Sequence, residues 1–112
     1  MCVRGDQQTP DTYNDIYAPV IRGEIIRLLT SLLVNDTELI AEQMDAVSAF
    51  LNGNLSEDIF MYNPPGRTSS SRFVRLVETL YGLRQAPFEW HHVIDEFLHS
   101  IGFVKLKSAN CL

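Results

Sequence analysis

The chain has 112 residues, of which 46% are hydrophobic and 21% charged, and its formal net charge is −5 at pH 7. This composition argues against an intrinsically disordered chain, and no apolar run is long enough to span a bilayer. The net negative charge argues against a free-standing nucleic-acid-binding protein, because affinity for a phosphate backbone comes largely from clustered lysine and arginine. The length allows at most one modest domain.

The N-terminal residues lack the apolar stretch of a signal peptide, which predicts an intracellular protein. Cys2 and Cys111 lie near opposite ends of the chain. A reducing compartment disfavours a bridge between them, so both are expected to be free thiols.

In chain order, residues 1–19 are rich in polar residues and proline, which predicts an extended or irregular lead-in that begins inside a strand. Residues 22–34 are predicted to form an amphipathic helix, because their apolar residues recur with helical spacing. Residues 39–45 are expected to form a strand, followed by a short helical turn over residues 47–51. The apolar residues with this spacing are Ile25, Ile26, Leu28, Leu29, Leu32 and Leu33.

In the second half, residues 59–62 are predicted to form a short strand closed by Pro64-Pro65-Gly66. Residues 73–77 alternate apolar and charged side chains and should pair with that strand as a hairpin. A second amphipathic helix is predicted from Pro87 to Ile101, with Gly102 as its terminator. No internal repeat or domain boundary is evident, so we expect one α+β unit in which two amphipathic helices pack on a small antiparallel sheet.

Asp45 stands at the predicted exit of the strand over residues 39–45. A carboxylate at the end of a buried strand is costly unless it is paired, hydrogen-bonded or bound to a cation, so this position indicates function. The alternative is a helix N-cap, because aspartate is among the best capping residues and residues 46–51 could form a turn of helix. This window alone leaves both interpretations open.

Five segments, in order from one end of the chain to the other, resemble the reverse transcriptase of copia-type LTR retrotransposons. They are VRGDQQ (3–8), YAPVIR (17–22), QMDAVSAFLNG (43–53), IFMYNPPG (59–66) and LYGLRQAPFEW (80–90). The resemblance implies a right-hand polymerase, of which residues 1–112 would form the fingers and the first half of the palm. It further implies a single partial domain truncated at both ends, without the remaining palm, thumb and RNase H regions.

The family extends a primer on an RNA or DNA template with deoxynucleoside triphosphates, using two Mg²⁺ ions held by carboxylates. The resemblance implies that Asp45 is a catalytic metal ligand and that the backbone carbonyl of Ala46 can coordinate the second ion. The family's other two aspartates lie in an aromatic-x-Asp-Asp hairpin, and this sequence contains no Asp-Asp pair. We therefore expect the chain to be inactive alone. Asp58, Asp95 and Glu96 are poor substitutes, because charged residues are usually exposed.

Phe50 matches the aromatic residue that stacks under the incoming sugar and excludes a 2′-hydroxyl; without the resemblance it would be interpreted as a core aromatic. Tyr81 and Gly82 match the floor of the nucleotide pocket, where glycine permits close approach of the backbone. Without the resemblance they form an ordinary turn. Arg84 and Pro87 match positions near the template strand.

Two other functions stay open. The chain could be a non-enzymatic remnant that binds a partner or the element's own polymerase, or a small α+β interaction domain in which Asp45 is a cap. His91, His92 and His99 show no paired zinc-ligand spacing with the cysteines.

Overall fold

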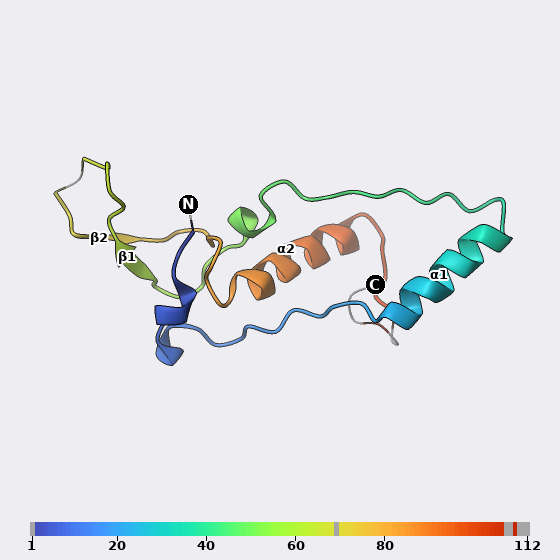
Figure 1. The fold of residues 1–112 in the computed structure, drawn as a ribbon, viewed down its shortest axis with the longest axis horizontal. Helices are drawn as coiled ribbons and strands as arrows, with labels where there is room; N and C mark the ends of the chain where they lie inside the picture. The colour runs from blue at the N-terminus through green and yellow to red at the C-terminus, as the bar shows by residue number, and fades with distance from the viewer. Residues whose placement is uncertain (1, 69, 107–108, 110–112) are drawn as a thin grey trace.

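The computed structural model describes residues 2–68, 70–106 and 109 (Figure 1). Two helices and one two-stranded antiparallel sheet confirm the small α+β architecture. The molecule is elongated, with a radius of gyration of 18.3 Å and extents of 62 × 27 × 25 Å, whereas a compact domain of this length has a radius of gyration of about 13 Å. In chain order the elements are η1 (Gly5–Gln7), η2 (Pro10–Thr12), α1 (Gly23–Asn35), η3 (Ala49–Asn52), β1 (Phe60–Tyr62), β2 (Phe73–Arg75) and α2 (Ala86–Ser100), where η denotes a 3-10 turn.

The two strands form the predicted hairpin. Their register pairs Phe60 with Arg75, Met61 with Val74 and Tyr62 with Phe73. Met61 and Val74 are half-buried, whereas the other four paired residues are exposed, so the hairpin has an inner and an outer face. The second strand ends at Arg75, two residues earlier than the alternating pattern predicts.

Both predicted helices are confirmed to within about one residue at each end. Pro87 occupies the first turn of α2, where its missing N–H is not required. After the last turn, Gly102 adopts a positive φ of 98°, and its N–H donates to the carbonyl of His99 at 3.0 Å. Glycine tolerates this left-handed conformation without the clash that a Cβ would bring.

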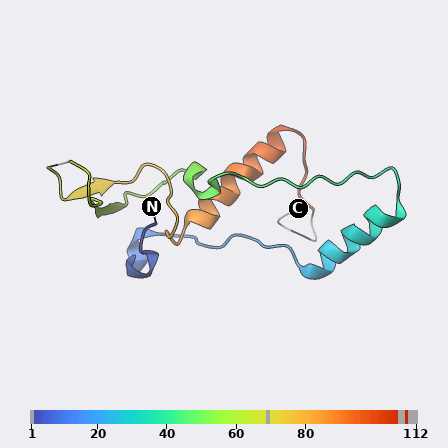
Figure 2. The same cartoon turned by 45° about the horizontal axis from the view of Figure 1, so that its top comes forward.

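The core is small and lies where the lead-in, η3, the strand ends and the start of α2 meet. Its buried members are Ile59, Leu83 and Ala86. Five half-buried apolar residues pack around them: Val3, Phe50, Leu55, Leu76 and Leu80. Segments far apart in the sequence therefore share one apolar cluster, with the hairpin extending from one side of it and α2 from the other (Figures 1 and 2).

The predicted strand over residues 39–45 is wrong. This segment is extended but forms neither helix nor strand, and all of its side chains are exposed. Figure 1 shows it as the long connection between α1 and η3. A strand needs a neighbour to satisfy its backbone hydrogen bonds, and no described segment pairs with this one.

The predicted strand at the start of the lead-in is also wrong within residues 2–20. These residues form the two 3-10 turns η1 and η2 instead, and no strand. The Val3 N–H donates to the Tyr81 carbonyl at 2.7 Å, and the described residues of the lead-in form no ladder.

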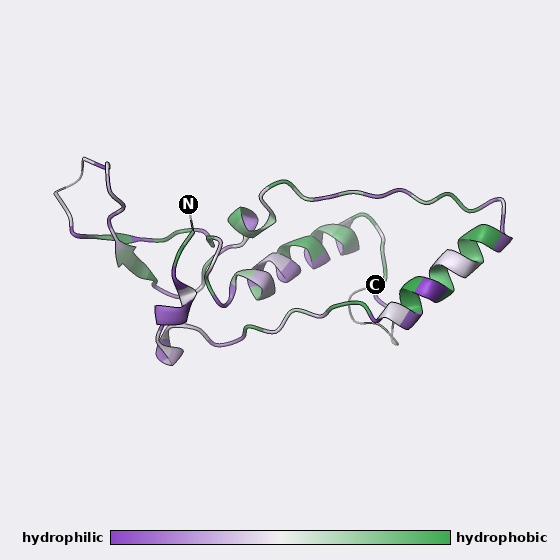
Figure 3. Ribbon diagram, in the orientation of Figure 1, coloured by the Kyte–Doolittle hydropathy of each residue, from purple (hydrophilic) through white to green (hydrophobic). Residues whose placement is uncertain are grey.

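The helices do not pack on the sheet as predicted. In the part of the chain that the structure describes, α2 contacts η3, and α1 contacts no other helix or strand. No residue of α1 is buried, and Ile26, Leu28, Leu29 and Leu32 are exposed. Figure 3 shows the hydrophobic residues along this helix. The hairpin strands are three residues long, too short to offer two helices a sheet face. Neither described helix combines the length and apolar content needed to cross a membrane.

The contact between the lead-in and Gly82 gives a stability prediction. Gly82 has a φ of 99°, and a Cβ there would collide with the Val3 carbonyl and the Cys2 sulfur. We expect Gly82→Ala to lower the free energy of unfolding by about 2–5 kcal/mol, combining backbone strain with overpacking. Gly66→Ala is the matched control, because Gly66 also has a positive φ but open space around it. It should cost only about 1–2 kcal/mol. Equal losses in urea titrations would show that the close contact contributes nothing.

Candidate functional site

Three of the predicted site residues lie together beside the core. Phe50 belongs to η3, and Tyr81 and Gly82 form the turn before α2. The rings of Phe50 and Tyr81 meet edge to face, with centroids 5.2 Å apart and an interplanar angle of 67°. This is a favourable arrangement for two aromatic quadrupoles. The structure thus brings the residues expected to bind a nucleotide into one cluster.

Thr79 fixes the position of Phe50. Its side chain is fully buried, and its hydroxyl donates to the Phe50 carbonyl. Its N–H donates to the Gly53 carbonyl at 2.9 Å. Because a buried hydrogen-bonding group is costly to leave unpaired, these bonds hold η3 against the segment that leads to Tyr81. Ser48, just before η3, turns the chain with a left-handed φ of 54°.

The sequence predicts that Gly82 permits close approach of the backbone in a nucleotide pocket, and the group that approaches it among the described residues is the chain's own lead-in. A Cβ on Gly82 would meet the Val3 carbonyl, and a Cβ on Gly5 would meet the Gly82 carbonyl. Only glycine at both positions permits this contact. Its conformational freedom is therefore used for packing inside the protein.

Arg84 joins the same lead-in. Its Nε donates to the Gly5 carbonyl at 2.9 Å, and its Nη1 donates to the Tyr13 hydroxyl at 3.3 Å. The guanidinium carbon also lies 5.6 Å from the centre of the Tyr13 ring, within cation–π range. The Arg84 side chain remains exposed, so its other N–H donors face solvent. Pro87 lies half-buried in the first turn of α2.

Gln85 is a residue of this region that the sequence did not single out. Its side chain is 1% exposed. Its Oε1 accepts from Gln8 Nε2 at 2.9 Å, and its Nε2 donates to the Thr12 carbonyl at 3.4 Å. Gln8 Oε1 in turn accepts from the Arg84 N–H at 3.2 Å. No periodicity marks a glutamine as buried, because burial here depends on a lead-in that is more than 70 residues away in the sequence.

Asp45 lies outside this cluster of contacts. Both it and Ala46 are exposed, and no hydrogen bond or ion pair within residues 2–68, 70–106 and 109 involves either side chain. Asp45 is not at the exit of a buried strand, and it is not a cap, because Ser48 precedes η3 and no side chain caps that turn. The structural premises of both interpretations are therefore wrong, while its proposed role as a metal ligand stays a prediction.

The residues present do not make up a metal site by themselves. Among the described residues, no group of three or more His, Cys, Asp or Glu side chains could hold a metal ion. Two of the alternative carboxylates have cationic partners: Asp58 pairs with Arg75 at 3.2 Å, and Asp95 pairs with Lys105 at 2.8 Å.

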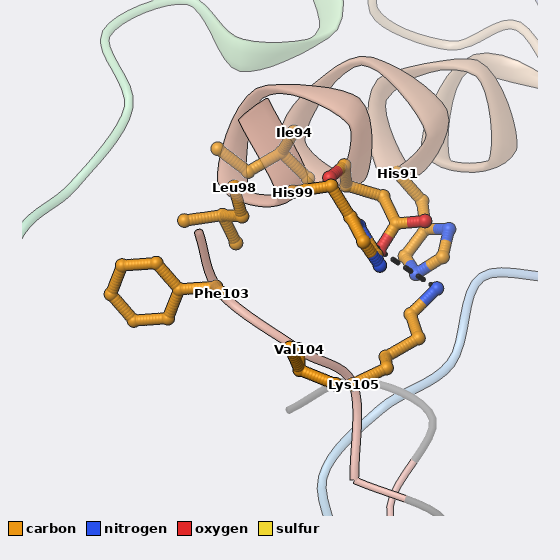
Figure 4. A pocket seen from close by; sticks show the side chains of 8 residues that line it. His91, Ile94, Leu98, His99, Phe103, Val104 and Lys105 are labelled. Atoms are coloured by element: carbon orange, nitrogen blue, oxygen red, sulfur yellow. Dashed lines mark hydrogen bonds and ion pairs between the residues drawn. The ribbon is translucent and has the colours of Figure 1, made fainter. Parts of the chain in front are cut away.

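A second polar cluster lies toward the C-terminal end of α2, beside a hollow of about 250 Å³ (Figure 4). The hydrogen bond from Lys105 is the main cause that lowers the pKa of Asp95. Burial, followed by the charge of Lys105, lowers the pKa of His91. The walls of the hollow are mainly apolar, with Ile94, Leu98, Phe103 and Val104 beside these charged groups. No residue implied by the resemblance lines it.

Glu89 and Glu57 form a third electrostatic feature, close to η3. Burial and the negative charge of Glu57 raise the pKa of Glu89. Glu57 Oε1 accepts from Asn14 Nδ2 at 3.1 Å, whereas its other carboxylate oxygen is buried with no hydrogen-bond partner. Two carboxylates thus repel each other where the start of α2 packs.

This repulsion predicts a pH dependence. The pKa of Glu89 is higher in the folded state, so the folded chain retains its proton where the unfolded chain has lost it. The free energy of unfolding should therefore fall as pH rises from the ordinary value of 4.5 through the raised value. We expect Glu89→Gln to remove that fall and to be more stable than the parent chain at pH 7. Urea titrations below pH 4.5 and at pH 7 measure the free energy of unfolding of each variant. Glu96→Gln, on the exposed side of α2, is the control. Parallel behaviour of the two variants would contradict the prediction.

Comparison with known proteins gives one consistent result. A family model described as reverse transcriptase (RNA-dependent DNA polymerase) matches residues 1–112. The chain is 34% identical over 116 aligned residues to the Pol polyprotein of transposon TNT 1-94 from Nicotiana tabacum, covering 100% of this chain and 9% of that protein. It is 34% identical to the transposon RE1 polyprotein of Arabidopsis thaliana, covering 100% and 8%.

A more distant relative is the Ty1-ER2 Gag-Pol polyprotein of Saccharomyces cerevisiae, 31% identical over 114 aligned residues, with 97% of this chain and 6% of that protein covered. The chain therefore spans less than a tenth of the length of these curated relatives. No solved structure matches it.

Proposed function

Because the chain belongs to the reverse transcriptase (RNA-dependent DNA polymerase) family, we propose that it is part of an enzyme that copies a nucleic-acid template into DNA from deoxynucleoside triphosphates. The observation that carries this proposal is the match of the family model to every residue of the chain. The resemblance to copia-type reverse transcriptases is confirmed by transposon polyproteins at 30–34% identity.

We assign the nucleotide side of the site to Phe50, Tyr81 and Gly82. The edge-to-face contact between the two rings supports this assignment, because it holds Phe50 at a fixed angle beside the turn. The buried hydroxyl of Thr79 supports it further by holding the Phe50 backbone. A ring held from two sides can exclude a ribose 2′-hydroxyl by its bulk, whereas a mobile ring would move away.

Asp45 is proposed as one carboxylate ligand of a divalent cation, Mg²⁺ by family resemblance, with the Ala46 carbonyl beside it. Both residues are exposed, which leaves room for other parts of a larger protein to supply the remaining ligands of the ion. The described residues lack the remaining ligands. The chain alone is therefore proposed to lack polymerase activity.

Arg84 and Pro87 are proposed to lie near the template strand. The exposed N–H donors of Arg84 support this role, since its two bonds to the lead-in leave part of the guanidinium open. An arginine fixed in this way can contact a phosphate with little further loss of side-chain entropy. Pro87 would contribute by fixing the first turn of α2.

Residues 1–112 are proposed to form one partial domain, the fingers and first half of the palm of a right-hand polymerase. Two features of the fold support this proposal. The apolar side of α1 has no partner among the described helices and strands, and the buried core contains few side chains. Packing against the remaining palm would cover such a surface.

A chimaera tests the role of Asp45. In the transposon TNT 1-94 polyprotein, the matching segment would be replaced by residues 1–112 and primer extension measured with Mg²⁺. We expect Asp45→Asn to lower the rate by about a hundredfold or more, because a metal-binding carboxylate contributes several kcal/mol. Asp15→Asn, an exposed carboxylate of the lead-in, should leave the rate unchanged. The chain by itself should give no extension. An active Asp45→Asn chimaera would refute the assignment.

The same chimaera tests Phe50. We expect Phe50→Ala to raise the incorporation of ribonucleotides relative to deoxyribonucleotides by about tenfold or more, since one steric contact in a pocket is worth roughly 1–3 kcal/mol. Phe88→Ala is the matched control, because Phe88 is a half-buried aromatic of α2 outside the cluster with Tyr81. The ratio of the two kcat/KM values is the measurement. Unchanged discrimination in Phe50→Ala would place the 2′-hydroxyl filter elsewhere.

A further inference from the structure

The outer face of the β1–β2 hairpin carries three large aromatic side chains. Phe60 and Tyr62 lie on the same side of β1, and the register places Phe73 opposite Tyr62. The three side chains are 62%, 64% and 48% exposed, in that order. The rings of Tyr62 and Phe73 are 4.9 Å apart and tilted by 38°. A cluster of exposed aromatic residues indicates an interaction surface.

Arginines border this aromatic face. The guanidinium carbon of Arg72 lies 5.6 Å from the Tyr62 ring centre and 5.8 Å from the Phe73 ring centre. Arg75 lies opposite Phe60 and pairs with Asp58 at the surface, where water and salt weaken the pair. Arg67 extends from the loop that joins the strands. No carboxylate pairs with Arg67 or Arg72 within the described part of the chain.

The charge of this segment is opposite to that of the whole chain. Residues 59–77 contain three arginines and no acidic residue, in a protein whose net charge is −5. Three of the nine lysines and arginines of the chain therefore lie on this hairpin beside the aromatic rings, with Asp58 and Glu78 just outside its two ends. Affinity for a phosphate backbone comes from such local groups of arginines, which the net charge of the whole chain does not reveal.

A hollow of about 320 Å³ adjoins the hairpin. It lies between the lead-in, which contributes Arg4, Gln7 and Gln8, and β1, which contributes Phe60 and Tyr62. It joins apolar walls to side-chain amides that can donate and accept hydrogen bonds. A flat, polar-edged group such as a nucleobase suits such a space.

We propose that the outer face of this hairpin binds single-stranded nucleic acid, with unpaired bases stacked on Tyr62, Phe73 and Phe60 and phosphates held by Arg72 and Arg67. Stacking on aromatic rings together with a positive surface is the general basis of single-strand binding. A duplex hides its base faces, so it cannot use the rings. An apolar protein partner would use the rings but gain nothing from the arginines. The ligand class rests on the proposed function, but the binding requires neither catalysis nor a metal.

The test uses the full chain with a chelator present and with no deoxynucleoside triphosphates. It measures the fluorescence anisotropy of a labelled oligouridylate. We expect Tyr62→Ala and Phe73→Ala each to weaken binding by about fivefold to a hundredfold, as for loss of one stacked base. We expect Arg72→Gln to reduce the slope of log affinity against log salt by about 0.7, the value for one phosphate contact on a single strand. Tyr17→Ala and Arg27→Gln change an exposed aromatic and an exposed arginine away from the hairpin, so they should leave binding unchanged.

Three results of the binding assay would overturn the inference: no binding of the oligouridylate, equal binding of a duplex, or equal losses in the hairpin and control variants. Sedimentation measures whether Tyr62→Ala changes self-association; a change there with unaltered oligonucleotide affinity would identify the face as a protein contact and also overturn it. Circular dichroism checks that the variants fold. The assay contains no metal ion and no deoxynucleoside triphosphate, so its failure leaves the polymerase proposal intact. An inactive chimaera, in turn, leaves the binding result intact.

Discussion

The backbone contact between residues 3–5 and the turn at residues 81–83 holds the centre of this protein together. It requires glycine at both Gly5 and Gly82, because a Cβ on either would overlap a carbonyl group of the other segment. The Val3 N–H closes the contact on the Tyr81 carbonyl. Leu83 is buried immediately behind it, in the small core that also anchors the start of α2. The lead-in therefore stays in contact with the turn and the start of α2, although most of the 112-residue chain lies between the lead-in and these two segments.

The candidate site follows from this arrangement. Tyr81 is placed by the glycine contact, and Phe50 is placed by Thr79, so the two rings meet through two independent restraints. Arg84 and Gln85 extend the same junction to Gly5, Gln8 and Thr12. Asp45 has no such support, since it belongs to an exposed connection. The proposed nucleotide-binding residues are thus held by contacts among the described residues, whereas the proposed metal ligand Asp45 is exposed.

The apolar side of α1 and the outer face of the hairpin are both exposed, and they differ in chemistry. The apolar side of α1 carries leucine and isoleucine and has no partner among the described helices and strands, which suits burial against more protein (Figure 3). The outer face of the hairpin combines aromatic rings with arginines, which suits a polyanion with exposed bases. The two surfaces lie at opposite ends of an elongated molecule (Figure 1).

Both helices, the hairpin and the family could be predicted from the amino-acid sequence. Helical spacing placed α1 and α2, Pro64-Pro65-Gly66 and the alternation after it placed the hairpin, and five ordered segments identified the reverse transcriptase family. These features depend on neighbouring residues or on direct similarity. The prediction of a strand over residues 39–45 is wrong because its apolar residues suit a strand, but no described segment pairs with it. The burial of Gln85 and Thr79, the contact of Gly82 with the lead-in and the exposure of Asp45 follow from tertiary contacts alone. Each of these depends on which distant segment lies alongside, and no pattern within a window of sequence contains that information.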